Sequence, residues 1–184
     1  MATKARLTAE DLWQMPDDGV PRELVNGEII EMPLPAPPHG RLVSLISYYL
    51  VDHVKEHGGG EVVAGDVRLI LNLSYDPERV RGADVAFIST ERLPGGKLPE
   101  KFLPGAPDLV VEVLSPSNTS IEIQQKVRDF LEAGARLVWV LAHQARSATV
   151  YRADGTARLL RENDVLDGEN VLPGLRIPLE ELFR

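Results

Sequence analysis

The stretch PDLVVEVLSPS, residues 107–117, decides the fold class of this 184-residue chain. From Leu109 to Leu114 nearly every residue is Val or Leu, which is typical of a strand that is buried on both faces. Glu112 lies inside this strand. A carboxylate among aliphatic side chains costs several kcal/mol unless it is paired, protonated or bound to a metal. The sequence therefore predicts a specific partner for Glu112.

The segments that follow this strand predict a βαβ unit. A helix is expected over about 119–133, because Thr119 and Glu122 suit a capping box and Gly134 suits the position after the helix end. RLVWVLA (136–142) is a second strand with a continuous apolar run. Two such strands joined by a helix are typical of parallel neighbours in an α/β sheet. Ligands of such sheets bind where the strands end.

Working outward, turn and periodicity signals predict the remaining elements. PLPAPP (33–38) is expected to be a stiff loop that is neither helix nor central strand. No repeat or linker interrupts the chain, so we expect one α/β domain over residues 1–184. The other expected elements are a short helix capped by Thr8, a hairpin over 23–32 turning at Asn26-Gly27, a helix over 39–57, strands over 61–73 and 83–89, a hairpin over 147–160 turning at Asp154-Gly155, and a closing strand with one helical turn.

Composition narrows the class of protein. No apolar run approaches the roughly 20 residues that span a bilayer, so we expect no membrane contact. The first residues have no apolar signal region, and the chain contains no cysteine, so the expected location is the cytoplasm. The formal net charge is −8. Non-specific binding of nucleic acid usually relies on a basic face, and the charge therefore counts against such binding.

Two acidic residues are expected at the ends of neighbouring strands. Asp84 opens the apolar strand GADVAFI (82–88), and Glu112 lies near the end of its own strand. At about 4 Å the repulsion between two carboxylates is on the order of 4 kcal/mol at an effective dielectric constant of ~20. A divalent cation with oxygen ligands offsets that cost. The pair therefore predicts a metal site.

Lys126 is the third candidate residue. Apolar side chains at 123, 127, 130 and 131 mark the core-facing side of the expected helix, and Lys126 lies at the edge of that stripe. A long side chain there can lie along apolar surface and carry its ammonium group towards the carboxylates. Two carboxylates and a lysine around a metal favour phosphodiester hydrolysis, in which the metal activates water and the lysine stabilises developing charge.

Asp84, PDLVVEVLSPS and Lys126 together resemble the PD-(D/E)XK nuclease superfamily. The resemblance implies a restriction-endonuclease-like fold, a mixed β-sheet flanked by helices, here with additional hairpins. More closely, the chain resembles the bacterial Uma-type endonuclease group, formerly a domain of unknown function. RELVNGEIIEM with the following His39 matches the N-terminal pattern of that group. GADVAFI, Phe130 four residues after Lys126, AGARLVWV and LPGLRIPLEELF match the rest.

The resemblance implies a metal site and a catalytic lysine. Asp84 and Glu112 would bind Mg²⁺ or Mn²⁺ together with the backbone carbonyl of Val113. The usual lysine of the superfamily lies two residues after the acidic residue, where this chain has Leu114. In the Uma-type pattern the lysine has moved to the following helix, so the resemblance assigns its role to Lys126.

Two further residues complete the catalytic set that the resemblance implies. Glu23 and His39 would act by water-mediated metal contact or by contact with the substrate. Two positions depart from the group's pattern. Ala142-His143 stands where Asp-Pro is usual, and Phe130 stands where Tyr is common. Neither departure removes an expected metal ligand.

Each candidate also has a purely structural interpretation. Asp108 is an additional rival to Asp84, because the metal aspartate of this superfamily often belongs to a Pro-Asp pair. The structural interpretations are an ion pair of Glu112 with Arg68 or Arg136, a turn role for Asp84 after Gly82, a surface ion pair of Lys126 with Glu122, an exposed hairpin position for Glu23, a helix cap for His39, a strand-entry role for Asp108, and solvent-facing positions for His53, His57 and His143.

Two functions from different classes remain open at this level. The first is a Mg²⁺- or Mn²⁺-dependent endonuclease that cleaves DNA. The second is a non-catalytic oligomeric or partner-binding module on the same fold, with its carboxylates paired to arginines. A small nuclease that cuts both strands commonly works as a homodimer, and the helix LVSLISYYLV (42–51) is either an interface or a core helix.

Overall fold

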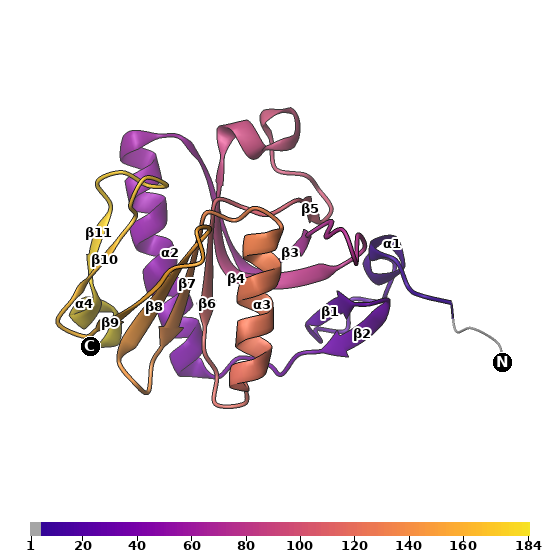
Figure 1. Ribbon diagram of the computed structural model, residues 1–184, viewed down its shortest axis with the longest axis horizontal. Coiled ribbons are helices and arrows are strands. Elements are labelled where there is room, and N and C mark those ends of the chain that lie inside the picture. The colour runs from indigo at the N-terminus through magenta and orange to yellow at the C-terminus, as the bar shows by residue number, and fades with distance from the viewer. Residues whose placement is uncertain (1–4) are drawn as a thin grey trace.

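The computed structural model describes residues 5–184, in which a mixed β-sheet lies between helices (Figure 1). Helix α3 (Ser120–Glu132) covers one face of the sheet, and α2 (Pro37–His57) covers the other. Nine strands form the sheet: β1 (Arg22–Val25), β2 (Glu28–Glu31), β3 (Gly60–Ile70), β4 (Val80–Ser89), β5 (Leu103–Pro104), β6 (Leu109–Val113), β7 (Leu137–Ala142), β8 (Ser147–Arg152) and β9 (Ala157–Arg161).

Short elements complete the fold at both ends of the chain. Helix α1 (Ala9–Trp13) lies beside the β1–β2 hairpin, and two 3-10 turns, η1 (Thr90–Arg92) and η2 (Pro94–Gly96), follow β4. A separate two-stranded sheet pairs β10 (Val165–Asp167) with β11 (Arg176–Pro178), and α4 (Leu179–Phe183) follows it. In residues 5–184 we find no helix that is both long and apolar enough to cross a membrane.

The predicted βαβ unit is confirmed. Strands β6 and β7 pair in parallel from Leu109↔Leu137 to Val113↔Leu141, and α3 is the crossover between them. Thr119 caps α3 through the predicted capping box with Glu122. Because side chains alternate along a strand, β6 sends every second residue to the α3 face, and Glu112 belongs to that set.

Strand β4 forks the sheet. Strand β3 pairs along one whole edge of β4, from Gly60↔Ser89 to Ile70↔Val80. On the other edge, β1 pairs with β4 only at Val80, and β6 pairs only with residues 85–87. Residues 81–84 therefore have no neighbouring strand on that edge within the described chain. The gap between β1 and β6 is where the sheet gives access to its interior.

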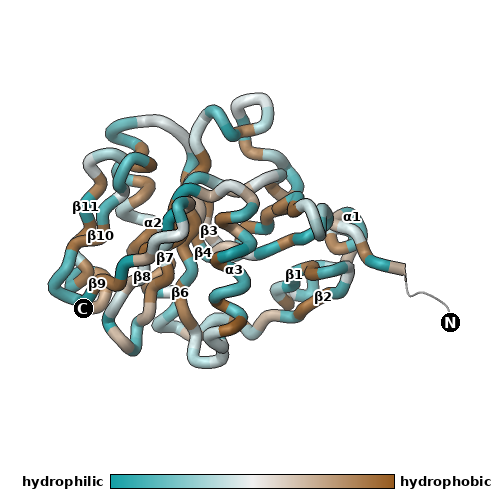
Figure 2. Tube along the Cα trace, viewed as in Figure 1, coloured by the Kyte–Doolittle hydropathy of each residue, from teal (hydrophilic) through white to brown (hydrophobic). Residues whose placement is uncertain are grey.

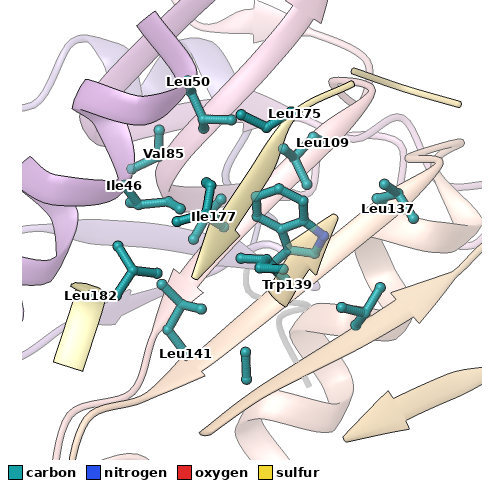
Figure 3. Close-up of a cluster of buried hydrophobic side chains, with 14 of the residues drawn as sticks. Ile46, Leu50, Val85, Leu109, Leu137, Trp139, Leu141, Leu175, Ile177 and Leu182 are labelled. Carbon is teal, nitrogen blue, oxygen red and sulfur yellow. The ribbon is translucent and has the colours of Figure 1, made fainter. Parts of the chain in front are cut away.

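Two apolar clusters hold the layers together. The cluster under α2 contains Leu42, Ile46 and Leu50, which pack with Trp139 and its neighbours (Figure 3). The cluster under α3 contains Ile123, Val127 and Phe130. Figure 2 shows hydrophobic residues gathered along the central strands, which both clusters share. Burial of this kind is worth roughly 25 cal/mol per Å² of apolar surface.

Several local expectations are confirmed, and two are wrong. Helix α2 starts at Pro37, inside the segment expected to be a loop, because proline at the first helical positions lacks only an N–H that would be unpaired anyway. His53 is buried and stacks on His57, with ring centroids 4.3 Å apart, whereas a solvent-facing position was expected. The hairpin turn at Asn26-Gly27 is present, with positive φ at both residues.

Candidate functional site

The fork in the sheet contains a cavity of about 290 Å³ that brings together the six residues singled out from the sequence. They come from five elements that are distant in the chain, so only the tertiary structure makes them neighbours. The six residues are Glu23 of β1, His39 of α2, Asp84 of β4, Glu112 and Val113 of β6, and Lys126 of α3.

Asp84 and Glu112 lie just beyond the point where β4 and β6 stop pairing. The register ends at Val85↔Val111, and Asp84 precedes Val85 while Glu112 follows Val111. Asp84 Oδ2 accepts a hydrogen bond of 2.7 Å from the backbone N–H of Val113. Both carboxyl groups line the cavity, where burial raises the pKa of Glu112 and Asp84 is close enough for its charge to add to the shift.

Glu112 is only 5% exposed and has one unsatisfied oxygen. Its Oε2 accepts a hydrogen bond of 2.7 Å from Lys126 Nζ, while its Oε1 is buried with no hydrogen-bond partner. Burial raises the pKa of Glu112 to about 8, with Lys126 opposing the shift and Asp84 adding to it. The expected ion pairs with Arg68 or Arg136 are absent from the described residues, where these arginines pair with Asp66 and Asp108.

Lys126 is buried between two carboxylates. Its Nζ lies 2.7 Å from Glu112 Oε2 and 3.2 Å from Glu23 Oε1. Burial lowers the pKa of the ammonium group, but Glu112 and Glu23 outweigh burial and raise it. The surface pair with Glu122 is wrong as an explanation for Lys126, because Glu122 instead caps α3 at Thr119. Lys126 is held as a fixed cation inside the cavity.

Glu23 is a buried acceptor and not an exposed hairpin acid. Its Oε1 accepts from the backbone N–H of Gly82 at 3.0 Å, and its Oε2 accepts from Arg81 at 2.7 Å. Burial raises the pKa of Glu23, but Lys126 and Arg81 together lower it below its usual value. Glu23 thereby accepts a hydrogen bond from the backbone of β4 at a residue that has no strand partner on this edge among the described residues.

A buried ion-pair network behind Glu23 was not expected from the sequence. Asp129 of α3 is fully buried and binds both Arg79 and Arg81 of the segment that enters β4. Arg79 also binds Asp76. Asp129 follows Lys126 by three residues and so lies on the same side of α3. The helix thus positions Lys126 directly and Glu23 indirectly, through Arg81.

His39 lies in the first turn of α2 and contacts Asp84. Its Nε2 is 3.2 Å from Asp84 Oδ2, and this hydrogen bond raises the pKa of His39, with burial opposing. The backbone of Val113 adds to the shift. Nδ1 of His39 is buried and has no partner. His39 therefore contacts the same carboxylate oxygen as the Val113 amide. The helix-cap interpretation is wrong, because the N-cap of α2 is Ala36 and no side chain in the described part of the chain caps that end.

Asp66 is a fourth carboxylate of the cavity, and the sequence analysis missed it. It lies at the β-bulge between Ala64 and Val67 with a positive φ of 57°. A Cβ atom on Gly82 would lie 2.2 Å from Asp66 Oδ1, so only glycine at position 82 leaves room for this carboxylate. Burial raises the pKa of Asp66. Glycine inside a strand pattern, here Gly65, is the signal that indicates such a bulge.

The donors of the cavity fit a hard divalent cation. Both contacts of Asp84 go to Oδ2, which leaves Oδ1 for a ligand, and Glu112 Oε1 is an unsatisfied oxygen. Mg²⁺ prefers such oxygen ligands and binds through one or two carboxylates, with water completing its shell. Across residues 5–184 we find no group of three His, Asp or Glu side chains already arranged around one metal position.

Asp108 and His143 lie away from this cavity. Asp108 accepts from the backbone N–H of Ser89 and lies within 4 Å of Arg92 and Arg136, so it holds loops together at the entry to β6. His143 follows β7 and lines a neighbouring pocket, and its Nδ1 is buried without a partner. Asp108 is therefore not a rival to Asp84 in this geometry.

Comparison with known proteins agrees with the arrangement of the helices and strands. A family model described as Uma2, putative restriction endonuclease, matches residues 9–180. The crystal structure of a putative nuclease belonging to DUF820 from Anabaena variabilis ATCC 29413 superposes with a TM-score of 0.83. The two chains are 19% identical, and the match covers 96% of this chain and 97% of the other. No curated protein matches the sequence.

Proposed function

Because the chain belongs to the Uma2 family of putative restriction endonucleases, we propose that it is a divalent-metal-dependent endonuclease that hydrolyses phosphodiester bonds of DNA. The resemblance seen in the sequence is confirmed by this membership, and the α/β fold by the match to a nuclease structure. The observation that carries the proposal is Glu112 Oε1, a buried carboxylate oxygen without a partner in a cavity that also contains Asp84 and Lys126. Buried carboxylate oxygens normally have a partner, and a bound cation would supply one here.

The proposed metal ligands are Asp84, Glu112 and the backbone carbonyl of Val113, with Mg²⁺ or Mn²⁺ as the ion. When bound, such an ion lowers the pKa of a water ligand and neutralises charge on a phosphoryl oxygen. Glu112 Oε1, which has no hydrogen-bond partner in the described structure, would be one of the ligands of this ion. The energetic cost of burying this carboxylate is the reason why the site has affinity for a cation.

The remaining residues of the cavity orient the reacting groups. Lys126 holds its ammonium group beside Glu112 and stabilises negative charge that develops on the phosphate. His39 holds Asp84 through Oδ2 and so fixes which oxygen faces the ion. Glu23 keeps Lys126 charged and in place. We propose all three as catalytic residues on this geometry.

The test of this function compares the wild-type protein with Glu112→Ala. We expect Mn²⁺ and Mg²⁺ to raise the melting temperature of the wild type and to support cleavage of DNA. Glu112→Ala should lose both responses and remain folded by circular dichroism. Glu56→Ala, at an exposed position of α2, is the matched control and should behave as the wild type. Cleavage by Glu112→Ala at the wild-type rate would refute the assignment.

The non-catalytic module is the outcome that the same experiment detects. That interpretation expects carboxylates paired to arginines, and Glu23 does pair with Arg81. Glu112 pairs instead with a lysine and keeps one oxygen free, which favours the enzyme. No metal-dependent shift in melting temperature would leave the fold without the chemistry, because binding to the folded state must raise that temperature.

We also propose a homodimer that acts in the cytoplasm, as a single domain over residues 1–184. The absence of cysteine supports the location, and the dimer is the arrangement that a small nuclease commonly uses when it cuts both strands. The inner side of α2, with Leu42, Ile46 and Leu50, is a core face, so an interface on this helix would use the side of Tyr48. Light scattering after size-exclusion chromatography tests the dimer, and a monomeric mass would refute it.

A further inference from the structure

A second groove adjoins the catalytic cavity. It has a volume of about 360 Å³ and lies between α1, β3 and the segment before β5. Asp66, at the β-bulge of β3, lines both spaces. We call it the Trp13 groove and define it by Trp13, Asp66, Arg68, Leu98, Lys101 and Phe102.

The groove offers an exposed aromatic surface with a rigid support. Trp13 is 39% exposed, although it is one of the largest apolar side chains of the protein. Its ring stands edge-on to Phe102, with centroids 5.2 Å apart and planes at 84°. Leu98, 44% exposed, lines the same groove. The indole is therefore held in place from beneath while part of its surface remains open to a ligand.

Two cations lie beside this aromatic surface. Arg68 stands 5.8 Å from the Phe102 ring centroid, and Lys101 stands 5.8 Å from that of Trp13. Arg68 contacts Asp66 only at 3.6 Å, and its Nε has no hydrogen-bond partner in the described structure. Lys101 pairs with Glu10 on the surface, an exposed contact worth less than about 1 kcal/mol. An anion in the groove would share these two cations with Asp66 and Glu10.

The charge of the catalytic cavity makes such cations necessary. The cavity contains four carboxylates, at Glu23, Asp66, Asp84 and Glu112, and its one lysine is already bound to two of them. A metal ion compensates the charge at the scissile phosphate, but it does not reach the phosphates of the neighbouring nucleotides. With a net charge of −8, the protein must bind those phosphates through local cations.

An open aromatic face next to cations is the chemistry that binds an unstacked nucleotide. Bases stack on such side chains, and each stacked base contributes enough to weaken binding about 5- to 150-fold when the aromatic residue is removed. Inside a duplex both faces of each base are covered by neighbouring base pairs. We propose that the Trp13 groove binds an unpaired nucleotide next to the scissile phosphate, so that the preferred substrate is DNA with a single-stranded segment. This inference rests on the proposed endonuclease function.

Intrinsic fluorescence tests the groove directly. The chain has two tryptophans, and Trp139 is completely buried, so a ligand that stacks on indole changes only the emission of Trp13. The probe is a single-stranded oligothymidylate of roughly 12 nucleotides, titrated into the wild type with Ca²⁺ at low salt. We expect quenching that saturates, and binding by Trp13→Ala, followed by fluorescence anisotropy of the labelled oligonucleotide, that is about 5- to 150-fold weaker.

Three controls distinguish base stacking on Trp13 from electrostatic attraction between the protein and the phosphates. Leu159→Ala removes a large apolar residue that is 60% exposed on β9 and does not line the groove, and it should bind the oligonucleotide as the wild type does. An abasic oligonucleotide of equal length keeps the phosphates and should not quench. A blunt duplex should bind more weakly than the single strand. Arg68→Gln should weaken binding and reduce the slope of log Kd against log salt by about 1.

The outcomes distinguish this inference from the function on which it rests. Equal binding by Trp13→Ala and the wild type, equal quenching by the abasic oligonucleotide, or tighter binding of the duplex would each overturn the inference. If the wild type also cleaves duplex DNA in a Glu112-dependent manner, the endonuclease proposal stands while the groove assignment fails. If Trp13 is quenched as expected but no metal-dependent cleavage occurs, the groove stands and the endonuclease proposal fails.

Discussion

Replacing Glu112 with glutamine should stabilise this protein, although most substitutions of buried residues destabilise. The folded state holds a carboxylate that is 5% exposed, and burial, which Asp84 reinforces, raises its pKa to about 8. The corresponding pKa in an unfolded chain is 4.5. Glutamine has the shape of the protonated acid and no charge to bury. The variant therefore keeps the packing of Glu112 and removes the cost of ionising it.

The size and sign of the effect follow from the pKa difference. Each pKa unit corresponds to about 1.4 kcal/mol, so ionisation of Glu112 costs the folded state about 5 kcal/mol above pH 8 and about 3 kcal/mol at pH 7. Because the folded pKa is raised, the stability contributed by proton binding is complete below pH 4.5. It is lost as the pH rises through about 8. The difference in free energy of unfolding between the variant and the wild type should therefore grow as the pH rises from 4.5 to about 8.

Melting temperature measured against pH in the presence of a chelator is the assay. At pH 7 the advantage of Glu112→Gln should be roughly 6 to 12 °C for a chain of this length, and it should vanish near pH 4.5. Glu56→Gln makes the same chemical change at an exposed site and should shift little at any pH. Mn²⁺ should stabilise the wild type but not the variant. At a Mn²⁺ concentration of 100 times Kd, the free energy of unfolding of the wild type should rise by about 2.7 kcal/mol. A variant that melts at or below the wild type at pH 7 to 8 would refute the reasoning.

Three further substitutions test the supports of the cavity. Gly82→Ala should cost about 1–3 kcal/mol in urea unfolding, because its Cβ would lie 2.2 Å from Asp66 Oδ1, and adding Asp66→Ala should recover part of the loss. Additive losses would contradict that contact. Asp129→Ala should destabilise by about 3–5 kcal/mol, since it leaves two buried arginines without their shared carboxylate. A loss of stability below 1 kcal/mol would show that water replaces the Asp129 carboxylate between the two arginines. Thr119→Ala should cost about 1 kcal/mol through loss of the α3 cap, and unchanged stability would contradict the capping box.

The sequence by itself determined the local elements and the identity of the chemistry-bearing residues. The apolar run around Glu112, the capping box at Thr119 and the glycine after the helix are local signals, and local signals fix strand, helix and helix end. The resemblance to a nuclease superfamily then named Asp84, Glu112 and Lys126, which the structure places in one cavity. Their catalytic and metal-binding roles remain a proposal.

Only the tertiary structure decided how these residues are paired and what surrounds them. The fork in β4, the position of Asp66 against Gly82 and the arginines that hold Asp129 depend on contacts between separate segments of the chain, and no local pattern encodes such contacts. The same holds for the choice of Glu112 and not Glu122 as the partner of Lys126. A helical spacing of four residues permits the surface pair, but burial of α3 against the sheet excludes water and makes the ammonium group bind the carboxylate that is buried with it.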